Sequence, residues 1–314
     1  MHEAAPRLAA AALRREGITA RALPGEDVQA FRRGRLHTRG GECVPGPATL
    51  GCFLETVQRE GGGPGRHGLL MPTAEGPCRF GQYCTLDRMV LEDLGWDPVH
   101  ILSWSSTDTY TGLSPKGWSR FWTALVLGDL LFKMRCRVAP YETEHGLADD
   151  CFDTWTARLA QAIDSGEQLE PLVAKARGAF IDIPRREEQR PLVGIVGEIY
   201  VRHNRFANQD LVRAVERAGG EAWLTPLTEW VLYIGYLDSH GLGNSNLGKK
   251  ARVAARLRHN FLTRTERRWM RLASPLLDNR HEPLMARILE EGSRFVPLDF
   301  VGEAILTLGR AMLF

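Results

Sequence analysis

This chain of 314 residues lacks several signatures of common protein classes. No two cysteines are spaced as CxxC, which excludes the usual zinc-ribbon and ferredoxin patterns. No apolar run reaches about 18 residues, so we expect no membrane span. The net charge is only +2, so overall charge alone does not indicate a polyanion binder, and a nucleic-acid partner is not expected. The Ala-rich start has no leader cleavage pattern and predicts a first helix that leads into a strand, in a cytoplasmic protein.

The chain does contain six cysteines, at positions 43, 52, 78, 84, 136 and 151. A disulfide framework is not expected in a chain of this length without a secretion signal. Cys52 and Cys136 fall inside predicted helices, so we interpret both as packing residues. Cys151 follows two aspartates at a predicted helix start and carries no clear role. Cys84 follows Cys78 closely enough to contact the same site.

Apolar runs alternate with amphipathic segments, which predicts an α/β fold. Residues 67–71 and 99–102 read as buried strands, and a helix that ends before Gly95 lies between them. These three elements predict a βαβ unit. A long, mostly buried helix is predicted over residues 118–138.

The second half of the chain repeats this plan. A charged, proline-bounded stretch at 182–191 reads as a linker. It is followed by a predicted strand at 192–201, a helix at 210–218 and a strand at 221–227. We therefore predict two α/β lobes, residues 1–184 and residues 185–314. Ligands collect at the carboxyl ends of parallel strands, so the loops at 72–83, 103–112 and 198–208 are candidate site walls.

Cys43 and Cys78 share one local pattern, a cysteine in a Pro/Gly loop that leads into a helix. Helix N-termini lower thiol pKa values, because free N–H groups and the helix dipole stabilise the thiolate. Two such cysteines on different loops suit a metal cluster, although two unrelated loop cysteines explain the pattern equally well. In the second lobe, "GIVGEIY" does not match GxGxxG, but Glu198 and Asn208 flank its loop and are candidate pocket residues.

A basic segment lies between residues 249 and 271, with nine Lys or Arg against one acid, Glu266. Its apolar residues predict a helix packed on a core, with a solvated basic face. The alternative is a docking surface for an acidic partner, a phosphorylated ligand or nucleic acid. The apolar stripe is predicted at Val253, Leu257, Phe261, Trp269, Leu272 and Leu276.

Four segments together resemble a known family: "ECVPGPATLGCFLE", "LLMPTAEGPCRFGQYCTLDRMVLEDLG", "VGIVGEIYVRHNRFANQDLVRAVERAGGEAWLTPLTEWVLY" and "FVGEAILTLG". They are similar to the 2-hydroxyacyl-CoA dehydratase and benzoyl-CoA reductase superfamily. The nearest group comprises dehydratase-related proteins associated with CoA-substrate-specific activases. The resemblance extends from about residue 10 to the last residue.

The resemblance implies two Rossmann-like lobes that face each other across a cleft and hold an iron–sulfur cluster, either [4Fe-4S] or a larger double-cubane type. It implies that Cys43 and Cys78 are cluster ligands, while Arg79, Gln82 and Tyr83 would shape the surroundings that tune its potential. Family members receive low-potential electrons from an ATP-dependent activase of the actin-like kinase type. They pass the electrons to an acyl-CoA or another small molecule, usually as paired subunits, in reductase or (R)-2-hydroxyacyl-CoA dehydratase-like reactions.

One departure from the family's sequence pattern favours other interpretations of this chain. Related chains continue past "GEAILTLGR" to a "CMPG"-like loop with a further cysteine ligand, whereas this sequence has no cysteine after Cys151 and ends at Phe314. A strand before the first helix also looks absent, so the chain looks shortened. The alternative is a non-catalytic subunit or truncated remnant that binds a partner without a competent cluster. A zinc site built from Cys43, Cys78 and Cys84 is a third possibility.

Overall fold

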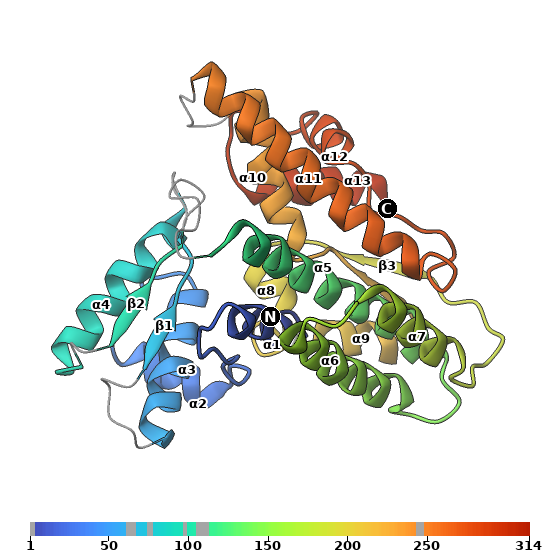
Figure 1. Cartoon of the computed structure of the whole chain (residues 1–314), viewed down its shortest axis with the longest axis horizontal. Coiled ribbons are helices and arrows are strands. Elements are labelled where there is room, and N and C mark those ends of the chain that lie inside the picture. The colour runs from blue at the N-terminus through green and yellow to red at the C-terminus, as the bar shows by residue number, and fades with distance from the viewer. Residues whose placement is uncertain (1–3, 61–66, 74–77, 97–98, 105–112, 243–247) are drawn as a thin grey trace. The chain divides into compact units, whose positions relative to one another are not determined.

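The computed structural model describes residues 4–60, 67–73, 78–96, 99–104, 113–242 and 248–314 (Figure 1). The chain divides into two compact units. We call residues 23–113 the small unit, and residues 1–22 together with 114–314 the large unit. The predicted boundary between residues 184 and 185 falls inside the large unit.

The small unit has these elements in chain order: α2 Val28–Arg35, α3 Pro45–Glu60, β1 Gly68–Leu70, the 3-10 turn η2 Arg79–Gln82, α4 Tyr83–Asp93 and β2 His100–Leu102. The large unit has the following order: α1 Ala4–Arg15, α5 Pro115–Val138, the 3-10 turn η3 Ala139–Tyr141, α6 Leu147–Ser165, α7 Glu170–Ile181, β3 Leu192–Ile195, α8 Ile199–His203, α9 Leu211–Arg217, β4 Glu221–Leu224, α10 Thr228–His240, α11 Lys249–Ala273, α12 Met285–Gly292 and α13 Glu303–Leu313.

The predicted βαβ unit is confirmed in the small unit. β1 and β2 pair in parallel, with Gly68 opposite His100, and α4 connects them. The buried side chains of α4 lie one helical turn apart and pack against both strands and α3. The helix ends where expected, because Gly95 takes a positive φ of 67° that other residues rarely adopt.

The second strand–helix–strand plan is also present, but its first strand is shorter than predicted. β3 and β4 pair in parallel, with Leu192 opposite Glu221. The predicted strand at 192–201 stops at Ile195. Gly197 has a φ of 126°, and the Glu198 carboxylate accepts the Val201 N–H at 2.8 Å, which starts helix α8 instead. The run of apolar residues that predicts a strand over 192–201 does not reveal the helix cap at Glu198.

Helix α5 is the centre of the large unit. It begins at the Ser114 cap, whose hydroxyl accepts the Gly117 N–H at 2.9 Å, with Pro115 in its first turn. Its apolar residues are buried nearly all around, and α1, α6, α7, α11 and β4 contact it. The predicted long helix at 118–138 is therefore confirmed.

Two helix pairs touch through their backbones at glycine. A Cβ atom on Gly34 of α2 would lie 1.8 Å from the Pro47 carbonyl oxygen, and one on Gly51 of α3 would lie 1.7 Å from that of Ala30. Helices α12 and α13 repeat the arrangement at Gly292 and Gly309. No side chain fits at these crossings, so the helices approach more closely than side-chain packing allows.

The coarse fold prediction is thus confirmed: the structure combines helices with short parallel strands. The strand expected directly after the first helix is absent, since residues 16–22 form none. Of the candidate loop 103–112, residues 105–112 lie outside the described residues. Among the helices of the described ranges, none is both long and apolar enough to cross a membrane.

Candidate functional site

Cys43 and Cys78 both lie exposed on the small unit with free thiols. Cys43 precedes α3 by two residues, and its carbonyl accepts the Gly46 N–H at 3.0 Å. Cys78 directly precedes η2, which continues into α4, and its carbonyl accepts the Gly81 N–H at 3.2 Å. Each thiol therefore occupies the entrance to a helical segment, as the sequence predicted.

The two cysteine loops are in contact with each other. The Arg79 guanidinium, next to Cys78, donates to the carbonyl of Gly41, two residues before Cys43. On the other side of Cys43, Gly46 lies against the Tyr83 ring, where a Cβ would sit 3.5 Å from Cε1. These contacts bring together the two loops that carry the exposed thiols, and we call the surface of these loops the two-cysteine surface.

The remaining cysteines face the interior or helix flanks. The thiol of Cys84 is buried and donates to the Met71 carbonyl at 3.1 Å, with Ser103 Oγ at 3.2 Å, so it points away from the two-cysteine surface. Burial raises the pKa of Cys52 to about 12 and that of Cys136 to about 11. Both are packing residues, as predicted. Cys151 is half-buried on α6.

The three predicted neighbours of Cys78 differ in their environment. Arg79 ties the loops together, as described above. Tyr83 is buried, and its ring meets Phe80 edge-on with centroids 5.5 Å apart. Gln82 is exposed and makes no capping bond to α4. Arg79 and Tyr83 thus define the shape of the two-cysteine surface, whereas Gln82 lies at its solvent side.

Glu198 and Asn208, the candidate pocket residues of the second lobe, have structural partners. Glu198 caps α8. The Asn208 amide donates to the carbonyls of Val201 and Arg202 at 3.0 Å each, and its oxygen accepts the Leu211 N–H at 3.1 Å. Their hydrogen bonds hold the turn between α8 and α9.

Asp87 is a buried acid in the small unit that the sequence did not single out. It is 0% exposed on the inner face of α4, and both carboxylate oxygens lack a hydrogen-bond partner among the described residues. Burial alone raises its pKa to about 7. Its only signal in the sequence is its position in the apolar register of α4, one turn after Tyr83.

The large unit holds a buried network of charges next to the carboxyl ends of β3 and β4. Lys133 of α5 pairs with Glu282 at 2.5 Å, donates to the Leu224 carbonyl at 2.9 Å and lies 4.2 Å from the centre of the Trp223 ring. Arg310 of α13 bridges Glu282 and Glu229. Burial opposes ionisation of Glu282, but Lys133 and Arg310 outweigh it and hold its pKa at about 2.

Residues of α8 and α5 add further contacts to this network of charges. Arg202 pairs with Glu229 at 3.3 Å. The Asp129 carboxylate of α5 accepts the N–H groups of Leu227 and Thr228 at 2.9 and 3.0 Å, which caps α10. Sequence reasoning missed this network, although charges embedded in the apolar run of α5 were its signal.

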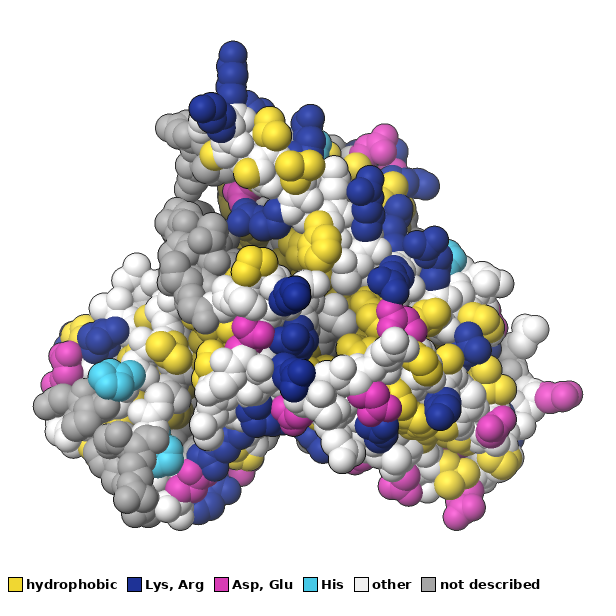
Figure 2. Space-filling model, in the orientation of Figure 1, with side chains coloured by type: hydrophobic (Ala, Val, Ile, Leu, Met, Phe, Trp, Pro, Cys, Tyr) yellow, Lys and Arg dark blue, Asp and Glu magenta, His cyan; other side chains and the backbone are white. Residues whose placement is uncertain are grey.

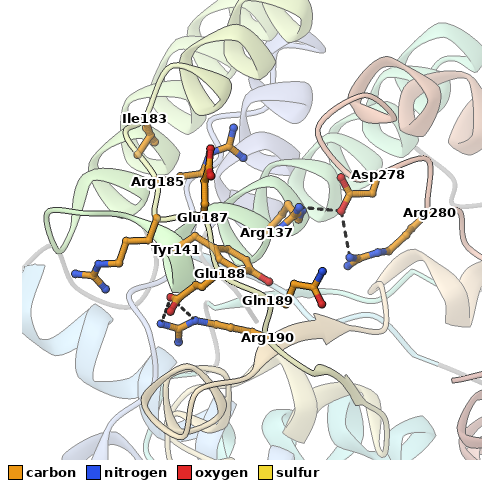
Figure 3. Close-up of a pocket in the computed structure, with 11 residues that line it drawn as sticks. Arg137, Tyr141, Ile183, Arg185, Glu187, Glu188, Gln189, Arg190, Asp278 and Arg280 are labelled. Carbon is orange, nitrogen blue, oxygen red and sulfur yellow. Dashed lines mark hydrogen bonds and ion pairs between the residues drawn. The ribbon is translucent and has the colours of Figure 1, made fainter.

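A surface depression of about 670 Å³ lies on the predicted linker segment (Figure 3). Five arginines line it, and three of them form ion pairs with carboxylates. Arg137 and Arg280 both pair with Asp278, at 2.8 and 3.2 Å, and Arg190 pairs with Glu188 at 2.6 Å. Arg185 and Arg186 form no ion pair within the described residues. The rim can therefore attract a small anion, and the segment 182–191 is a wall of this depression.

Helix α11 carries the predicted basic face, with dark blue side chains interspersed with yellow ones in Figure 2. Arg264 and Arg267 are exposed. The predicted apolar stripe is wrong in its first half, since Val253, Leu257 and Phe261 are 61%, 67% and 48% exposed. The packed face runs instead through these residues: Ala255, Leu262, Glu266, Trp269, Met270 and Ala273.

Within the described residues, no group of three or more His, Cys, Asp or Glu side chains is arranged to hold a metal ion. The zinc hypothesis therefore loses its third ligand, because Cys84 faces the core. No family model, curated protein or solved structure matches the chain. The family resemblance rests on the sequence motifs alone.

Proposed function

We propose that this chain is an iron–sulfur protein of the 2-hydroxyacyl-CoA dehydratase type, which accepts low-potential electrons from an ATP-dependent activase and passes them to a substrate. One observation carries the proposal. Cys43 and Cys78, the two residues that the motifs designate as ligands, are exposed on loops that contact each other. Buried or separated thiols would have argued against it.

The two-cysteine surface fits a cluster in part. Thiolates are the usual ligands of iron–sulfur clusters, and both thiols lie exposed at helix entrances. Four ligands are usual, and the described residues supply two. We therefore propose a shared site, in which the remaining ligands come from a paired subunit. A bound cluster would supply one-electron transfer.

This chain's own residues would hold that site in place. Arg79 would hold the two loops together through its hydrogen bond to the Gly41 carbonyl. Tyr83 packs beneath Gly46 and excludes water from the base of the Cys43 loop. In the same proposal, the strand–helix–strand plan of each unit is a portion of a Rossmann-like lobe.

Anaerobic reconstitution with iron and sulfide tests the proposal. We expect visible absorption, bound iron and acid-labile sulfide in the wild type, and the loss of all three in Cys43→Ser and Cys78→Ser. Cys151→Ser on α6 is the matched control and should retain the cluster. Far-UV circular dichroism should be nearly the same in all variants, since both loop thiols are exposed. A wild type that stays iron-free would refute the cluster.

The second candidate is a non-catalytic subunit that binds a partner without a cluster. The presence of only two suitable thiols among the described residues favours it. The two candidates differ in one measurement. A non-catalytic subunit should still associate with a partner subunit when both cysteines are serine, whereas a shared cluster site should lose both the cluster and much of the association.

The activase requires a docking surface, and we propose the exposed basic face of α11 for it. Arg264 and Arg267 form no ion pair within the described residues, so their charge is available to an acidic partner. The neighbouring exposed Leu257 and Phe261 add apolar surface of the kind that protein interfaces bury. A solvated helix with no partner is the competing interpretation.

A further inference from the structure

The first half of helix α11 exposes a row of apolar side chains. Val253, Leu257 and Phe261 are each about half exposed or more, and they follow one another at every fourth residue. An α-helix turns by about 100° per residue, so the three side chains lie within about 80° of one another and form one ridge. We call these three residues the α11 ridge. Contiguous apolar surface that is rimmed by charged residues is typical of an interaction site.

The α11 ridge points away from the helix that α11 packs against. Ala255 and His259 each lie about 160° around the helix from Leu257, and these two residues face inward. Ala255 is buried, and a Cβ atom on Gly235 of α10 would lie 3.3 Å from the His259 Nδ1 atom. Helix α10 therefore holds the opposite face of α11, while the ridge stays open to solvent among the described residues.

The charge beside the α11 ridge is positive and has no counter-charge on this part of the helix. Residues 249–265 contain no Asp or Glu. Arg256 and Arg264 lie on the same flank of the ridge, within about 100° of its centre, and both are exposed without an ion pair in the described part of the chain. Arg258 lies on the other flank and is paired with Asp238 at 3.4 Å. A partner that covers the ridge must therefore bring negative charge.

We propose that the α11 ridge docks an acidic amphipathic helix of a partner protein, aligned with α11. This docking mode rests on the role proposed above for α11 and adds the chemistry of the partner segment. Side chains at every fourth position form the ridges that fit into the groove of a facing helix, and a stripe of about 80° has the width of a helix–helix seam. A helix that lies in a lipid surface buries a broader apolar face. A second copy of this chain would bring its own arginines against Arg256 and Arg264.

Three synthetic peptides test the proposal on the full-length protein, without activase or cluster. The first is an acidic amphipathic helix with leucines on one face and glutamates beside them, the second has lysine in place of glutamate, and the third has the acidic composition in scrambled order. Each has about 20 residues, because shorter isolated helices are marginal in water. Fluorescence anisotropy measures their affinities at low and high salt. We expect saturable binding of the acidic helix, at least about tenfold tighter than the scrambled peptide and weaker at high salt, and no binding of the lysine peptide.

Variants of exposed residues locate the binding site. Leu257→Ser should weaken binding of the acidic helix about tenfold or more, because it truncates the centre of the ridge. Arg256→Gln combined with Arg264→Gln should weaken binding and flatten its dependence on salt. Leu211→Ser, at an exposed leucine that starts α9, is the matched control and should change neither the affinity nor its salt dependence.

Equal affinity for the acidic helix and its scrambled form, or unchanged affinity in Leu257→Ser, would overturn the proposal. Binding to phosphatidylserine vesicles that Leu257→Ser abolishes would also overturn it, as would self-association that the same change abolishes, because the ridge would then serve a membrane or a second copy. An activase that associates while the acidic helix does not bind would refute this docking mode alone. Binding of the acidic helix without activase association would support the docking mode and refute the activase as its partner.

Discussion

Replacing Asp87 by asparagine should make the small unit more stable at alkaline pH. Asp87 is fully buried, has no hydrogen-bond partner among the described residues, and burial raises its pKa from 3.8 to about 7. An acid with a raised pKa binds its proton more tightly in the folded than in the unfolded state. Its effect on stability is therefore neutral below the unfolded pKa, and stability is lost as pH rises from about 4 to about 7.

The magnitude follows from the shift. A difference of about three pKa units corresponds to about 4 kcal/mol of unfolding free energy, fully lost above pH 7. Asp87→Asn keeps the shape of the side chain and removes the titration. Near pH 4 the variant and the wild type should be equally stable, and near pH 8 the variant should be more stable by up to about 4 kcal/mol.

Native-state hydrogen exchange measures this within one molecule, because amides of α4 report the small unit and amides of α5 in the large unit serve as reference. Asp93→Asn, an exposed acid on the same helix, is the matched control and should show no such pH dependence. A stability difference between Asp87→Asn and wild type that does not vary with pH would refute the reasoning, since it would mean that Asp87 is solvated or paired.

Three further predictions concern the large unit. Glu266→Gln should raise the unfolding free energy by about 3 kcal/mol above pH 7, and by progressively less toward pH 4.5. The reason is that the pKa of Glu266 is raised to about 7, so its ionisation destabilises the folded state. Urea titrations across this pH range measure the difference. Lys133→Met should lower the unfolding free energy by about 3–5 kcal/mol, since it leaves the Glu282 carboxylate short of one buried partner, and an equally stable variant in urea titration would contradict this. Reversing Arg264, Arg267 and Arg268 to glutamate should slow activase association and flatten its dependence on ionic strength, without altering the cluster spectrum. Unchanged stopped-flow rates at low and high salt would identify α11 as a solvated face.

Local patterns predicted much of the small unit. The strands around residues 67–71 and 99–102 and the intervening helix depend on alternation, helical spacing and the turn at Gly95, all of which are short-range. The shared pattern of the cysteine loops also anticipated that both thiols would lie at helix entrances. The role of Cys43 and Cys78 as ligands stays a prediction, because it depends on a cluster and on further ligands that the two loops do not supply.

Long-range contacts could not be read from the sequence. The small unit is inserted between α1 and α5, which pack on each other despite about a hundred intervening residues. The apolar stripe at Val253, Leu257 and Phe261 has helical spacing, but this half of α11 finds no core beneath those side chains. The position of Asp87 in the apolar register of α4 indicates burial, but the absence of a hydrogen-bond partner among the described residues depends on packing that the sequence does not reveal.

The backbone contact between α2 and α3 affects how the Cys43 loop can change. Residues 36–44 connect two helices that already meet at Gly34 and Gly51, so the helices set the span of the loop. Closing a longer loop costs little additional free energy, because the cost grows only with the logarithm of length. Insertions beside Cys43 are therefore tolerable, whereas a single methyl group at Gly34 would separate the helices. The spacing between the two thiols is thus open to adjustment by mutation while the helices beneath it stay fixed.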